Sequence, residues 1–174
     1  MSIRYLLFVG ICLGIARHVY AVDLTLKPGE TSDAVIDATV REIRTKCILA
    51  QDYYFLRRLA VAQMKSIASP TGGIWRVTNA QLKTVQNACT GRLMATCRKV
   101  QTKFIIDVST VTMSDLQKPL HSGLIMSLFI SSSVPPVPLQ KGQQALSWKH
   151  YINSNGNVSQ FSIWSNELEK LSGE

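Results

Sequence analysis

Apolar residues recur at helical spacing along most of this 174-residue chain. Recurrence at three and four residues marks the buried face of an amphipathic helix. Asn79 is placed to cap one such segment, and Ser114 and Gln117 form a capping-box pattern at the start of another. The pattern predicts six helices, at about 33–50, 52–65, 79–104, 114–131, 140–153 and 158–171.

Between these segments the chain has few residues that favour strands. Residues 69–73 (Ser-Pro-Thr-Gly-Gly) predict a turn, and the alternating residues 74–77 predict a short strand after it. The proline-rich segment 134–138 predicts a rigid loop. The expected fold class is therefore mostly α, either all-α or α+β, with about six helices and at most a minimal β element.

The N-terminal 21 residues have the features of a cleaved signal peptide. Arg4 supplies a positive charge, residues 5–15 form an apolar run, and Val19 and Ala21 provide small residues before a cleavage point. The run is shorter than the roughly 20 apolar residues of a membrane-spanning helix. We expect a secreted, extracellular protein in which residues 22–174 form one domain without a membrane span. A buried N-terminal helix or a signal anchor is the alternative.

Charge is distributed unevenly along the chain. The formal net charge is +8, and residues 53–106 contain nine Lys and Arg but no Asp or Glu. Such a stretch gives the surface a positive potential and favours anionic partners, namely acidic glycans, cell-wall polymers or other polyanions. Nucleic acid is not expected, because the protein is predicted to be secreted. The alternative is a solvated helical surface that acidic residues near the termini neutralise after folding.

Three cysteines remain once the signal peptide and its Cys12 are removed. An extracellular protein with three cysteines is expected to hold one disulfide and one odd thiol. Cys89 and Cys97 fall on one predicted helix, where eight residues span roughly 12 Å, which is too far for a disulfide. Cys47 is therefore expected to pair with one of them. The odd cysteine is either buried or linked to a partner chain.

Three segments suggest a family. They are Arg-Arg-Leu-Ala-Val-Ala-Gln-Met-Lys at 57–65 followed by Gly-Gly-Ile-Trp-Arg-Val at 72–77, Asp-Leu-Gln-Lys-Pro-Leu-His-Ser-Gly-Leu at 115–124, and Trp-Lys-His-Tyr-Ile-Asn at 148–153. Together they resemble lysozyme-like and lytic transglycosylase-like proteins, and more closely a group of secreted invertebrate proteins of that kind. The resemblance covers roughly residues 47–168 and implies a lysozyme-like α+β fold.

The resemblance also implies a general acid at the end of the helix that carries the two arginines. Glycan-cleaving members have a glutamate there, which protonates the glycosidic oxygen. Gln63 occupies that position here, and an amide has no proton to give at physiological pH. Asp52, Asp107 or Asp115 would have to fold in to replace it. Since loss of a general acid costs typically about 10²–10⁴-fold in rate, we expect that catalysis has been lost.

Four other residues are candidate glycan contacts through the same resemblance. Tyr151 and Asn153 match the turn that lines the family's cleft, and Arg76 stands where its members usually carry Gln. Trp75 could be a platform on which a sugar stacks. A core position is the alternative for Trp75, and it is the preferred interpretation for Trp164.

The sequence thus predicts a secreted, basic, non-catalytic lysozyme-like protein that binds glycans or anionic polymers. An extracellular matrix, including a mineralised one such as a shell, is a setting that suits it. The alternatives are an active peptidoglycan hydrolase and a basic antimicrobial protein. Asn157 begins an Asn-Val-Ser glycosylation sequon. No cofactor or metal is expected, because His121 and His150 show no ligand spacing with the cysteines.

Overall fold

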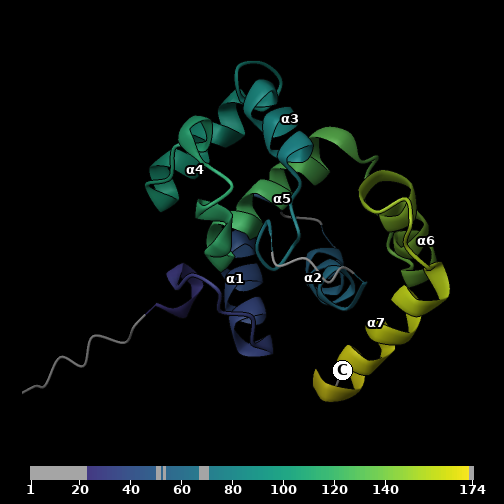
Figure 1. Ribbon diagram of the computed structural model, residues 1–174. Helices are drawn as coiled ribbons and strands as arrows, with labels where there is room; N and C mark the ends of the chain where they lie inside the picture. The colour runs from purple at the N-terminus through teal and green to yellow at the C-terminus, as the bar shows by residue number, and fades with distance from the viewer. Residues whose placement is uncertain (1–22, 50–51, 53, 67–70, 173–174) are drawn as a thin grey trace, which may run out of the picture.

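The computed structural model describes residues 23–49, 52, 54–66 and 71–172 (Figure 1). The expected signal peptide lies outside these residues. The described residues contain no β-strand, and the protein is mostly α, as predicted. The described part of the chain forms seven α-helices: α1 (Asp33–Thr45), α2 (Phe55–Ser66), α3 (Asn79–Cys89), α4 (Met94–Phe104), α5 (Pro119–Ser133), α6 (Lys141–Ser147) and α7 (Val158–Ser172).

Helix α5 forms the centre of the fold. Twelve of its fifteen residues are buried, as expected for a helix that is apolar on all sides. Helices α1, α2 and α3 pack against it, and in Figure 1 it lies between α3 above and α1 and α2 below. The helix begins at Pro119, where the missing N–H of proline costs no hydrogen bond.

The predicted start of this helix at Ser114 is wrong. Residues Asp115–Gln117 form a separate 3₁₀ turn, and the Ser114 side chain makes no capping hydrogen bond. The Asp115 carboxylate instead accepts a hydrogen bond from the backbone N–H of Thr112, at 3.0 Å. Because of this turn and the proline that follows it, α5 begins at Pro119 rather than at Ser114.

Helix α7 covers α2 and also packs on α6. Aromatic rings fill the space between them: the Phe161 ring centroid lies 6.4 Å from that of Phe55 and 5.2 Å from that of Trp148. Trp148 begins a five-residue π-helix, Trp148–Ile152, that continues α6. The predicted helix at 140–153 is therefore two segments of different pitch.

The single helix predicted at 79–104 is also two helices. Thr78, rather than Asn79, caps α3 and forms a capping box with Gln81. The chain then turns through residues 90–93 before α4 begins. The turn folds α4 back toward α3, so the Cα atoms of Cys89 and Cys97 lie 5.7 Å apart and the two residues form a disulfide.

This disulfide corrects the predicted cysteine pairing. Cys47 is free and exposed, and it follows α1 in a left-handed conformation with φ 54°. The distance argument against a Cys89–Cys97 bond was wrong because it assumed a continuous helix. Linkage of the odd cysteine to a partner chain stays a prediction.

The strand predicted at 74–77 is a turn. Gly72 and Gly73 have φ of 78° and 68°, and Arg76 has φ of 50°, so the chain repeatedly enters the left-handed region. The Val77 N–H donates to the Gly72 carbonyl at 3.0 Å. A Cβ on Gly73 would lie 1.9 Å from the Leu116 carbonyl oxygen, so this position requires glycine.

Candidate functional site

The side chain of Gln63 lies inside the protein and joins three elements. It is 1% exposed near the end of α2. Its Nε2 donates to the Trp75 carbonyl at 3.3 Å, and its Oε1 accepts from the Trp148 indole N–H at 3.2 Å. Both polar atoms of the amide are therefore engaged, and the position expected to face a substrate is closed.

Both tryptophans that contact Gln63 are core residues. Trp75 and Trp148 are each 0% exposed, and the Trp75 indole N–H donates to the Leu56 carbonyl at 2.9 Å. The prediction of Trp75 as a glycan contact is wrong, and its core alternative is confirmed. Trp164 packs only partly against the core and keeps a part of its surface exposed.

No aspartate named as a replacement acid reaches Gln63. Asp52 precedes α2, whose start lies eight residues, or about 12 Å, before Gln63. Asp107 accepts a hydrogen bond from the Ser109 N–H at 2.9 Å, and Asp115 accepts one from the Thr112 N–H at 3.0 Å. Within the described residues, the Gln63 side chain has hydrogen bonds only to the two tryptophans.

A polar pocket of about 610 Å³ opens at the C-terminal end of α2. Asn153 Nδ2 lies 3.4 Å from the Ser66 hydroxyl, so the predicted cleft-lining turn does come next to this helix end. Amides and one indole form most of its wall, which comprises Ser66, Asn153, Asn155, Gly156, Asn157, Gln160 and Trp164. Amides beside an aromatic surface suit an uncharged sugar, whose hydroxyls bond to polar groups and whose ring packs on apolar ones.

The other predicted contacts do not join this pocket. Tyr151 is exposed and lines a different hollow with His150, whose ring centroid is 4.5 Å away. Arg76 follows the buried Trp75, and its Nε is buried without a hydrogen-bond partner among the described residues. Burial lowers the pKa of the Arg76 guanidinium. The structure thus brings Asn153, but not Tyr151, to the end of α2.

The sequon residue Asn157 lies at the edge of the polar pocket. Its Oδ1 accepts hydrogen bonds from the backbone N–H groups of Ser159 and Gln160, at 2.9 and 3.2 Å, and so caps α7. Its Nδ2, the atom to which a glycan is attached, has no hydrogen bond in the described part of the chain. Glycosylation of Asn157 stays a prediction.

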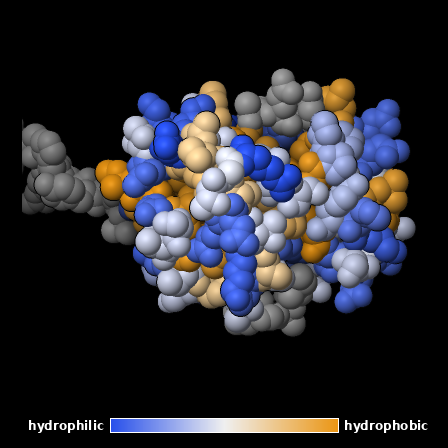
Figure 2. Space-filling view, turned by 90° about the horizontal axis from the view of Figure 1, so that it is seen from above, coloured by the Kyte–Doolittle hydropathy of each residue, from blue (hydrophilic) through white to orange (hydrophobic). Residues whose placement is uncertain are grey.

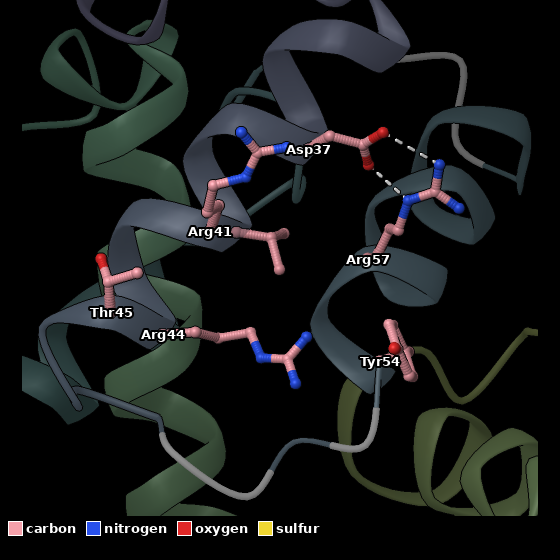
Figure 3. Close-up of a pocket in the computed structure, with 7 residues that line it drawn as sticks. Asp37, Arg41, Arg44, Thr45, Tyr54 and Arg57 are labelled. Atoms are coloured by element: carbon pink, nitrogen blue, oxygen red, sulfur yellow. Dashed lines mark hydrogen bonds and ion pairs between the residues drawn. The ribbon is translucent and has the colours of Figure 1, made fainter. Parts of the chain in front are cut away.

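A second pocket, which we call the arginine pocket, was not predicted from the sequence. It measures about 400 Å³ and lies between α1 and the start of α2 (Figure 3). Arg57 binds Asp37 through two hydrogen bonds, and Figure 3 shows the Arg44 guanidinium extending from α1 toward α2. Its walls are formed by Asp37, Val40, Arg41, Arg44, Thr45, Tyr54 and Arg57.

Asp52 supports the arginine pocket from inside the protein. It is 0% exposed, accepts a hydrogen bond from the Leu56 N–H at 3.3 Å, and forms an ion pair with Arg44, whose Nε lies 3.3 Å from its Oδ1. Burial raises the pKa of the Asp52 carboxyl above its ordinary value of 3.8, and the Arg44 charge opposes this effect. The Arg44 guanidinium also lies over the Tyr54 ring, 5.0 Å from its centroid.

The third feature is an exposed cationic surface on α3 and α4. Figure 2 shows the molecule from the side on which α3 lies in Figure 1, and apolar residues there form small groups among hydrophilic ones. Within the described residues, none of the cations on α3, α4 and their connection pairs with a carboxylate. These exposed residues are Lys83, Arg92, Arg98, Lys99 and Lys103.

Neutralisation by acidic residues therefore holds only for part of the basic stretch. Lys65 pairs with Glu167 of α7 at 2.7 Å, and Arg57 pairs with Asp37 of α1. The α3–α4 cations keep their charge without such partners. Among the described residues there is no cluster of three or more His, Cys, Asp or Glu suited to a metal ion. No helix in the same part of the chain is long and apolar enough to cross a membrane.

No family model, curated protein or solved structure matches the chain. The resemblance to lysozyme-like proteins therefore rests on the three sequence segments alone.

Proposed function

We propose that the protein is a secreted, non-catalytic, lysozyme-like protein that binds anionic polymers, acidic glycans foremost. The observation that carries this proposal is the α3–α4 surface, where five exposed cations have no acidic partner in the described structure. Unpaired cations on a surface attract polyanions over a distance of about 10 Å at ordinary ionic strength. Binding in an extracellular matrix, including a mineralised one, would use the same surface.

Burial of Gln63 supports the non-catalytic part of the proposal. A general acid must lie within hydrogen-bond reach of the bond that it protonates. Gln63 is 1% exposed and bonded on both polar atoms, so its side chain is out of reach of a substrate, and its amide has no proton to give. The polar pocket beside it supports the glycan part, since its amides and Trp164 suit the uncharged portions of a sugar chain.

The test is a binding assay with a sulfated polysaccharide and its desulfated counterpart. We expect the protein to bind the sulfated form and to bind the desulfated form at least tenfold more weakly. The triple variant Lys83→Gln, Arg92→Gln, Lys103→Gln should weaken binding of the sulfated form about tenfold, since each exposed contact contributes up to about 1 kcal/mol.

The matched control removes three other surface charges, through Lys27→Gln, Lys118→Gln and Lys149→Gln. It changes the net charge equally and should weaken binding by no more than about twofold to threefold. Equal losses in both triple variants would show that net charge alone acts and would exclude the α3–α4 surface. Release of soluble fragments from purified peptidoglycan by the unaltered protein would overturn the non-catalytic assignment.

A further inference from the structure

We propose that the arginine pocket binds a tetrahedral oxyanion, carried as a sulfate ester on an acidic glycan. This inference rests on the proposed polyanion-binding function and names the group that is recognised. The arginine pocket is also separate from the polar pocket. Tyr54 and Arg57 stand at the start of α2, whereas Ser66 is its last residue, about 15 Å away along the helix.

Positive charge exceeds negative charge at the pocket. Three arginines line it, and a fourth, Arg58, has its guanidinium carbon 5.9 Å from the Tyr54 ring centroid. The acidic groups that face these arginines are Asp37 and the buried Asp52. The three lining arginines therefore exceed these two carboxylates by one formal charge, and Arg58 adds a second nearby, beside a hollow that low-dielectric protein partly encloses.

Two of the three lining arginines have guanidinium N–H groups that can donate hydrogen bonds to an anion. Within the described structure, Arg41 is exposed and has no hydrogen bond or ion pair. Arg44 uses only its Nε on Asp52, which leaves its two outer nitrogens directed into the space between the helices (Figure 3). A guanidinium presents five N–H donors, so these residues supply several charge-assisted hydrogen bonds to an anion.

The arrangement suits a tetrahedral anion better than a carboxylate. A carboxylate has two oxygens, and one guanidinium satisfies both, as Arg57 does for Asp37. A sulfate ester has three terminal oxygens and gains from donors that converge from different directions. The donors without a partner in the described structure belong to two side chains of α1, Arg41 and Arg44, and the pocket volume of about 400 Å³ leaves room for the attached sugar.

The pocket also adjoins the cationic α3–α4 surface. Lys99 of α4 donates to the backbone carbonyl of Cys47 at 3.3 Å, and Cys47 lies two residues after Thr45 of the pocket wall. A glycan anchored by one ester in the pocket can therefore continue along α4, where Lys103 follows one turn after Lys99.

The test uses inorganic sulfate as the probe and the full chain labelled with ¹⁵N. Sulfate is titrated at constant ionic strength while the Nε–Hε NMR signals of the arginines are followed. We expect saturable shifts of the Arg41, Arg44 and Arg57 signals, and for Arg92 only a weak shift that does not saturate. Arg41→Gln should weaken sulfate binding about tenfold, whereas the control Lys149→Gln, which removes an exposed charge outside the pocket and outside the α3–α4 surface, should change it less than twofold.

A second arm compares a sulfated disaccharide with the same disaccharide without sulfate. Saturable shifts with the sulfated form alone support the ester, and shifts with free sulfate but not with the disaccharide overturn it. Unsaturable shifts at all arginines, or equal affinity for acetate and sulfate, overturn the tetrahedral site. If these arms fail while the Lys83, Arg92 and Lys103 variant still loses polymer binding, the pocket is excluded and the proposed function stands.

Discussion

A single side-chain amide connects two of the segments that resemble lysozyme-like proteins, residues 72–77 and 148–153. Gln63 accepts from Trp148 and donates to the Trp75 carbonyl, in a site with no access to solvent. The sequence singled out this residue because it departs from the family pattern. Its burial could not be predicted, because one of its partners lies 85 residues away and reaches it only through the packing of α6 and α7 on the fold.

Replacement Gln63→Glu should make stability depend on pH in a new way. A protonated Glu can make the same two hydrogen bonds, but an ionised one is buried without charge compensation, so its pKa will be raised. Its stabilisation is complete below the unfolded pKa of about 4.3 and is lost as pH rises through the folded pKa. In urea denaturation we expect near-wild-type stability at pH 4 and a loss of about 1–3 kcal/mol at pH 7.5.

Gln63→Met is the control for this change, because it removes both hydrogen bonds at every pH. Its free energy of unfolding should therefore be lowered by a similar amount at pH 4 and at pH 7.5. A difference between Gln63→Glu and the natural protein that does not vary with pH would contradict the closed site. The same would follow if Gln63→Glu cleaved peptidoglycan, since that activity requires substrate at a residue that is 1% exposed.

His121 should make the protein less stable in mild acid. Burial, and then the charge of Lys118, lowers the pKa of this half-buried imidazole, although Asp115 opposes the shift. A histidine with a lowered folded pKa stabilises the fold above the unfolded value of 6.5, and this stability is lost as pH falls through the folded pKa. We expect the free energy of unfolding of His121→Phe, measured by urea denaturation, to fall less than that of the natural protein as the pH is lowered below 6.5. A difference in unfolding free energy between the two proteins that stays constant from pH 8 to 4.5 would contradict this prediction.

Among the elements, helices were easier to predict than their ends. The apolar period continues from Cys89 through Leu93 to Cys97 at four-residue spacing, so the sequence gives no sign that the helix stops between them. The break depends on the turn that starts at Thr90 and on the packing of Leu93, which is 7% exposed. The disulfide was predicted incorrectly for the same reason, because its geometry depends on that break.

The junction between α6 and α7 depends on one buried glycine. A Cβ on Gly156 would lie 2.5 Å from the edge of the Trp148 ring, and that ring is fully buried with its N–H on Gln63. Gly156→Ala should therefore destabilise the protein by roughly 1–3 kcal/mol in urea denaturation. Gly142→Ala in α6 is the matched control, since nothing lies within 4 Å of its new methyl group and it should be neutral or stabilising by up to about 1 kcal/mol. Equal effects would show that Trp148 can move away.

For the whole molecule, the sequence predicted the amount of charge but not its placement. The basic stretch was expected to give the surface a positive potential, and folding divides its residues among ion pairs, the arginine pocket and the α3–α4 surface. Arg41 and Arg44 lie outside that stretch, and they meet Arg57 only because α1 packs beside α2. Contact between helices is a tertiary property that neither composition nor periodicity contains.

This placement makes a prediction about the salt dependence of polymer binding. Salt shortens the range of exposed charges from about 10 Å at 0.1 M to about 3 Å at 1 M, so the affinity for a sulfated polysaccharide should fall steeply as salt is raised. The slope of log affinity against log salt should be smaller in the Lys83, Arg92 and Lys103 triple variant, because fewer bound ions are exchanged. The Lys27, Lys118 and Lys149 control should keep the natural slope. An affinity that hardly changes with salt would contradict binding by surface charge and would favour recognition of uncharged sugar in the polar pocket.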